Sequence, residues 1–110
     1  MSDAIVVFMT AGSADEARRI AQELVESRLA VCVQILPEIE SVYRWNDEVQ
    51  REKEVLLLAK TTADRFAALD KSVRAIHSYQ TPQIVAVPVA AISEPYHRWL
   101  IQNVSATAGG

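Results

Sequence analysis

Residues 54–60 read Glu-Val-Leu-Leu-Leu-Ala-Lys, and this stretch decides the fold. Five apolar residues between two charged ones match a short buried strand. Successive side chains of a strand point to opposite faces of its sheet, so both faces are apolar here. Helices that cover one face would leave the other apolar face in water. The pattern therefore predicts that the second face contacts another protein surface, most simply a second copy of the chain.

The segments around this strand predict an alternation of further strands and helices. Apolar residues recur with a period of two or form short runs in some segments, and recur every three or four residues in others. The expected strands cover residues 4–10, 31–36, 39–45, 55–60 and 84–89, and the expected helices cover 13–28, 62–76 and a short stretch after 93. This order predicts an α+β, ferredoxin-like βαββαβ fold, with two helices on one face of an antiparallel sheet and a short C-terminal helix.

Local signals support the boundaries of these elements. Ser13, with Glu16 three residues later, is typical of a capping box at the start of the first helix. Thr61 or Thr62 is the expected cap of the second helix. Asn46-Asp47 is a turn signal, so residues 39–60 are expected to form a long hairpin with a polar tip.

Length, charge and cysteine content narrow the class of protein. The 110 residues fit one domain, residues 1–110, in which 106–110 are small and polar and are expected to fray. A formal net charge of −3 argues against nucleic acid or an anionic membrane as partner. The single cysteine cannot form an internal disulfide, and residues 1–9 lack the pattern of a secretion signal. We therefore expect a cytoplasmic protein.

Several segments together resemble the CutA divalent-cation tolerance family. They are Cys32-Val33-Gln34-Ile35 followed by Pro37, Tyr43-Arg44-Trp45, Glu54 through Thr61, His77-Ser78-Tyr79-Gln80-Thr81-Pro82, and the strand from Ile84 to Val89. The likeness runs from about Ile5 to Leu100. It implies a ferredoxin-like fold, a tight homotrimer whose hairpins cross subunit boundaries, and a role in tolerance of divalent metals, copper above all. No agreed enzymatic reaction belongs to the family.

Imidazole and sulfur ligands suit copper, and the candidates are few. His77 is the first, in the segment that resembles the family's His-x-Tyr-x-x-Pro motif; the alternative is a histidine that hydrogen-bonds the end of the preceding helix. Family members described as copper-binding carry a cysteine where this chain has Met9 and a second histidine where it has Ile76. Met9 and Cys32 are weaker candidates, because both suit a buried strand. His97 is expected to pack or lie at the surface.

A second candidate site combines aromatic and basic side chains. Tyr43, Trp45, Lys60 and Tyr79, together with His77, match family positions near subunit junctions, and a cleft there would suit a small ligand. The alternative is plain interface packing. Three hairpin carboxylates could instead collect a hard cation across subunits or simply form a solvated edge: Glu48, Glu52 and Glu54.

Two functions follow from these residues. The first is a trimeric divalent-metal, chiefly copper, tolerance or response protein. The alternative is a ligand-sensing or adaptor trimer, related in architecture to nitrogen-regulatory signalling proteins and lacking a dedicated metal site. No enzyme is expected, since the loop at residues 11–14 has one glycine and leads into Asp15-Glu16, which would repel a phosphate.

Overall fold

The computed structural model describes residues 3–105. The strands are β1 (Ala4–Ala11), β2 (Cys32–Trp45), β3 (Glu48–Thr62) and β4 (Ile84–Pro88), and the helices are α1 (Ala14–Glu26), the 3-10 turn η1 (Ala63–Arg65), α2 (Phe66–Ile76) and α3 (Glu94–Ser105). The predicted order of elements is confirmed. The predicted fraying of residues 106–110 lies outside the described residues. In the described part, every helix is too short or too polar to cross a membrane.

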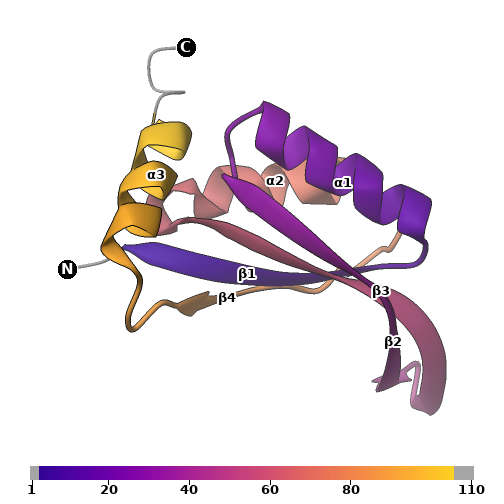
Figure 1. Cartoon of the computed structure of the whole chain (residues 1–110). Coiled ribbons are helices and arrows are strands. Elements are labelled where there is room, and N and C mark those ends of the chain that lie inside the picture. The colour runs from indigo at the N-terminus through magenta and orange to yellow at the C-terminus, as the bar shows by residue number, and fades with distance from the viewer. Residues whose placement is uncertain (1–2, 106–110) are drawn as a thin grey trace.

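The four strands form one antiparallel sheet in the order β2-β3-β1-β4. Helices α1 and α2 cover one face, and α3 stands at the end where β1 begins (Figure 1). The main core lies beneath α1 and α2 and includes these fully buried side chains: Val7, Met9, Ala11, Ala17, Ile20, Leu24, Leu57, Ala59, Leu69 and Val73. This is the predicted ferredoxin-like arrangement.

The predicted helix caps have different outcomes. The Ser13 Oγ accepts a hydrogen bond from the Glu16 N–H at 3.1 Å, so the predicted cap of α1 is confirmed. Thr62 is the N-cap residue of η1, which leads directly into α2, but its side chain makes no capping hydrogen bond, and α2 itself has no side-chain cap. The physical reason is that β3 continues to Thr62, where the side chain is buried and bonds Asp64 instead.

The hairpin turn is the predicted one. Only Asn46 and Asp47 separate β2 from β3, and both have positive φ, at 53° and 64°. Two positive φ angles define the turn whose twist matches that of the flanking strands, and Asn and Asp tolerate this region better than other side chains.

A bulge in β2 decides which way the hairpin side chains face. Leu36 pairs with Leu56, but the next pair is Ile39 with Glu54, so β2 carries one extra residue near Pro37. Proline lacks an N–H and interrupts the ladder at this point. Beyond this point, the extra residue moves the odd-numbered side chains of β2 onto the face of Leu56. Beyond the bulge, the hairpin bends away from the sheet (Figure 1).

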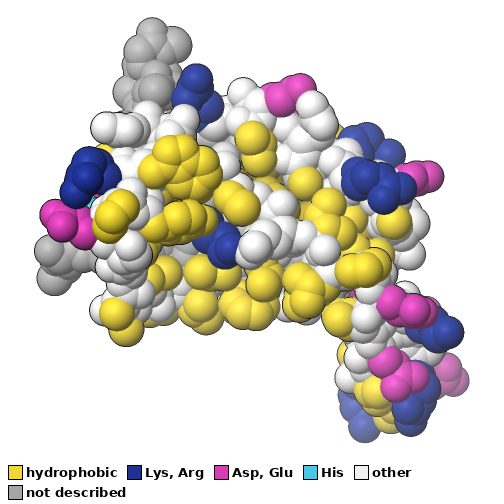
Figure 2. All heavy atoms as spheres, in the orientation of Figure 1, with side chains coloured by type: hydrophobic (Ala, Val, Ile, Leu, Met, Phe, Trp, Pro, Cys, Tyr) yellow, Lys and Arg dark blue, Asp and Glu magenta, His cyan; other side chains and the backbone are white. Residues whose placement is uncertain are grey.

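The face of the sheet opposite α1 and α2, called here the outer face, is apolar, as the sequence predicted. Its apolar side chains come from all four strands: Val6, Phe8, Leu36, Leu56, Leu58, Val85 and Val87. Figure 2 shows hydrophobic side chains spread over the body of the molecule, while charged ones lie on the projecting hairpin and around the rim of the body. Val85 is 51% exposed and Val87 is 41% exposed. Helix α3 packs on Ala4 at one end and leaves most of this face open.

Candidate functional site

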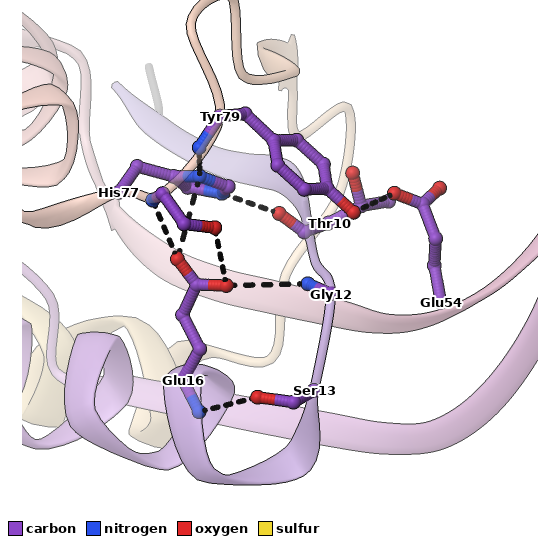
Figure 3. Close-up of polar contacts among 8 residues, drawn as sticks. Thr10, Gly12, Ser13, Glu16, Glu54, His77 and Tyr79 are labelled. Atoms are coloured by element: carbon purple, nitrogen blue, oxygen red, sulfur yellow. Dashed lines mark hydrogen bonds and ion pairs between the residues drawn. The ribbon is translucent and has the colours of Figure 1, made fainter.

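His77 lies directly after α2, and both of its ring nitrogens are engaged. The Nε2 atom lies 2.7 Å from the carbonyl oxygen of Thr10, and Nδ1 lies 3.0 Å from the backbone nitrogen of Tyr79 (Figure 3). A carbonyl can only accept, so Nε2 carries the proton, and Nδ1 accepts from the Tyr79 N–H. The His77 side chain is fully buried. Its ring therefore ties the loop after α2 to the end of β1.

Glu16 strengthens the same junction. Its carboxylate accepts hydrogen bonds from the Ser78 N–H at 2.7 Å, the Ser78 hydroxyl at 3.0 Å and the Gly12 N–H at 3.3 Å (Figure 3). Burial alone would raise the pKa of Glu16, but these hydrogen bonds outweigh it and lower the pKa below its ordinary value. The sequence predicted Glu16 only as part of a helix cap, and nothing near it in sequence indicated its contact with Ser78.

The three proposed copper ligands do not come together. In the sheet register, Met9 pairs with Leu57 on the helix-covered face, where both side chains are fully buried. Cys32 pairs with Lys60 on the outer face. Residues 3–105 contain no group of three or more histidine, cysteine, aspartate or glutamate side chains placed to hold a metal ion. These positions do not fit a copper site built from Met9, Cys32 and His77 together.

A cleft opens on the outer face where the hairpin leaves the sheet. It has a volume of about 530 Å³ and is lined by Thr10, Ser41, Val42, Tyr43, Trp45, Glu52, Glu54, Tyr79, Gln80, Thr81 and Gln83. Three of the five residues grouped for a ligand cleft line it, Tyr43, Trp45 and Tyr79, whereas His77 is not among the lining residues. Lys60 does not line it either, because it lies further along β3 and its ammonium group bonds the Gln34 side chain of β2.

Tyr79 connects the cleft to the junction around His77. Its hydroxyl donates to the Glu54 carboxylate at 2.6 Å, and Glu54 is only 8% exposed. Burial, and then the negative charge and hydrogen bond of Glu54, raise the pKa of Tyr79 well above its usual range, so the phenol stays a donor. Gly12 permits this packing, because a Cβ there would lie 3.3 Å from the Tyr79 hydroxyl.

Comparison with known proteins assigns the family. The fold defines a ferredoxin-like α+β domain, and residues 5–103 match the model of the family described as CutA1 divalent ion tolerance protein. The chain belongs to this family. The divalent-cation tolerance protein CutA of Thermus thermophilus is 48% identical over 98 residues, which cover 89% of this chain and 95% of that protein.

Solved structures agree with this assignment. A divalent cation tolerance protein (Cut A1) from Thermus thermophilus is 47% identical with a TM-score of 0.89, and the match covers 91% of this chain and 97% of that one. CutA from Xylella fastidiosa is 34% identical with a TM-score of 0.91, covering 94% and 99%. The human protein CutA is 37% identical over 86% of this chain, but the chain spans only 53% of that longer relative.

Proposed function

We propose that this chain acts as a homotrimer in tolerance of divalent cations, copper among them, and that it catalyses no reaction. We place it in the cytoplasm, without nucleic acid or membrane as partner. The observation that carries the assembly is the apolar outer face, which spans all four strands and which the helices of residues 3–105 cover at one end only. The role in tolerance of divalent cations rests on membership of the family.

Exposure of this apolar face to water is unfavourable in free energy. Apolar surface removed from water stabilises an assembly by roughly 25 cal/mol per Å². Strands β2 and β4 form the two edges of the sheet, so a neighbour that covers the outer face can also reach an edge. The number of subunits, three, is taken from the resemblance to the family.

Copper binding at His77 requires a local rearrangement. A metal ion needs a free lone pair, and the Nδ1 lone pair of His77 accepts from Tyr79 while Nε2 donates to Thr10. A typical intramolecular hydrogen bond contributes about 0.5–1.5 kcal/mol, so releasing one or both weakens copper binding about 2- to 150-fold relative to a preformed site. We therefore expect copper uptake that is weaker than at a site with ready ligands.

Native mass spectrometry with added Cu(II) tests both parts of the proposal. The expected result is a trimer that gains one copper per subunit and loses it in His77→Ala. The matched control is His97→Ala on α3, at the opposite end of the sheet, which should keep the copper. A monomeric mass contradicts the assembly. A trimer that gains no copper, or gains it equally in His77→Ala, contradicts copper binding at His77.

The second candidate function is a ligand-sensing or adaptor trimer without a dedicated metal site. The observation that favours it is the cleft beside Tyr79, with a volume of about 530 Å³, whereas residues 3–105 contain no group of three or more side chains placed to hold a metal ion. Clefts of about 300–1,000 Å³ with a few convergent polar groups are typical of small-molecule sites.

A further inference from the structure

A single basic side chain of residues 3–105 lies on the apolar outer face. Alternation along β3 places Lys60 on the same face as Leu58, in register with Val6 of β1. Its ammonium group bonds the neutral side chain of Gln34, and it forms no ion pair with a carboxylate of residues 3–105. A subunit that covers the outer face would therefore bury a positive charge that its own chain does not neutralise.

Two carboxylates lie at the other end of the same face, where the hairpin leaves the sheet. Glu52 and Glu54 line the cleft, and no lysine, arginine or histidine is among the lining residues. Glu54 accepts from the Tyr79 hydroxyl at 2.6 Å, and the hydrogen bond to Glu52 is the main cause that raises the pKa of Tyr43. Both donors are neutral phenols, so the two negative charges are also left without a counter-charge in one chain.

The strand that carries these charges also keeps them apart. Lys60 lies six residues from Glu54 and eight from Glu52, about 20 and 26 Å along an extended strand. Neither pair can therefore form within one chain. In a ring of identical subunits, however, each contact joins two different patches of the same chain. Charges that become buried at such a contact destabilise it unless they are paired.

The other basic side chains cannot take this place from the same face. The remaining lysines and arginines of residues 3–105 lie on helices, in η1, in the turn after α1 or on the opposite face of the hairpin. On that opposite face, Arg51 and Lys53 already form ion pairs with Glu40 and Glu38. Charge complementarity therefore favours Lys60 as the match for the acidic cleft.

We propose that Lys60 of the partner subunit enters this cleft and pairs with Glu52 and Glu54, so that each cleft of the trimer is completed by a neighbouring chain. The apolar stem of the lysine lies along the rings of Tyr43 and Trp45, and its ammonium group meets the two carboxylates. The inference rests on the homotrimer proposed above and names the residues that fix the register of its contacts. It also reunites Lys60 with the aromatic residues with which the sequence grouped it.

Chemical cross-linking tests whether the two patches meet between subunits. Glu52→Cys and Lys60→Cys are combined in a Cys32→Ser background and treated with a short bismaleimide, which can bridge the distance between the Cβ atoms of a lysine–glutamate pair. The two positions are too far apart along β3 to be joined within one chain, so we expect a covalent trimer on a denaturing gel. The matched control replaces Glu52→Cys with Glu40→Cys, on the opposite face of the hairpin, and should run as a monomer.

The mass of the untreated variant separates the two possible failures. A native trimer that yields no covalent trimer, or yields it equally with Glu40→Cys, overturns the pairing and leaves the assembly standing. A monomeric native mass in both the variant and the parent protein contradicts the assembly and the pairing together.

Charge exchange tests whether the contact is an ion pair rather than plain packing. Lys60→Glu places three carboxylates in one cleft, so we expect it to raise the concentration at which the trimer dissociates by about tenfold or more. Adding Glu52→Lys restores a cation and should recover most of this loss, while Glu54 keeps its bond to Tyr79. Glu40→Lys added to Lys60→Glu has the same net charge and should recover none. Native mass spectrometry over a dilution series measures these changes, and equal recovery by Glu52→Lys and Glu40→Lys, or recovery by neither, contradicts the pairing.

Discussion

Replacing Leu58 with aspartate tests the assembly most directly. Leu58 lies near the middle of the outer face, paired with Phe8 of β1 on one side and Gln34 of β2 on the other. It is only partly buried within one chain. Its side chain should be buried fully when a second copy covers this face.

The expected loss of assembly free energy is large, because the substitution is present in every subunit. Burying a leucine side chain contributes about 1.5–3 kcal/mol, and burying an unpaired carboxylate costs several kcal/mol more. A loss of roughly 5 kcal/mol at each interface weakens that contact by more than a thousandfold. We therefore expect Leu58→Asp to be monomeric at micromolar concentration.

Light scattering coupled to size-exclusion chromatography measures this outcome. The matched control is Val25→Asp on the exposed side of α1, on the other face of the sheet, where the side chain is 42% exposed. We expect this control to keep the mass of the parent protein. A Leu58→Asp variant with trimeric mass and an unchanged melting temperature would refute the reasoning that the outer face is an interface.

Two further predictions concern the polar junction and are measured by denaturant unfolding at fixed protein concentration. Glu16→Gln should lower the free energy of unfolding by about 2–4 kcal/mol near neutral pH, since it removes charge-assisted hydrogen bonds. The pKa of Glu16 is lowered in the folded protein, so its contribution is present above its ordinary pKa of 4.5 and is lost as the pH falls below it. The matched control is the exposed Glu23→Gln on the same helix, which should stay within about 0.5 kcal/mol of the parent protein near neutral pH. Tyr79→Phe should cost about 1.5–3 kcal/mol, since the carboxylate of Glu54 loses its donor. The pKa of Tyr79 is raised, so wild-type stability should fall more steeply than that of Tyr79→Phe above pH 10.0; parallel curves in either comparison would contradict these assignments.

Part of the candidate site was visible in the sequence. Tyr43, Trp45 and Tyr79 were predicted to share a cleft and do line one. Lys60 was grouped with them by resemblance, but along β3 it lies six residues from Glu54, which is about 20 Å in an extended strand. The sequence predicted the carboxylates of Glu52 and Glu54 only as part of a hard-cation site or of a solvated edge. The hydrogen-bond donors that orient these carboxylates lie on other segments of the chain, so the pattern within one strand does not show them.

The position of His77 after the second helix was predicted, but its chemistry was not. Its two hydrogen-bond partners are Thr10, which is 67 residues away, and Tyr79, which is two residues away. Whether a buried imidazole is free to bind a metal depends on such partners, and periodicity carries no information about them. Copper binding at His77 therefore stays a prediction for the experiment described above.

The sequence by itself determined the order of strands and helices, the turn at Asn46-Asp47 and the apolar character of both sheet faces. These properties depend on local backbone preference and on the alternation of side chains along a strand, and residues close together in the sequence determine both. Only the tertiary structure decided which face of the hairpin meets the cleft, because one extra residue near Pro37 reverses the alternation in β2. The same bulge places Tyr43 and Trp45 on the side of Glu52 and Glu54, since strand pairing, and not sequence distance, sets which side chains share a face.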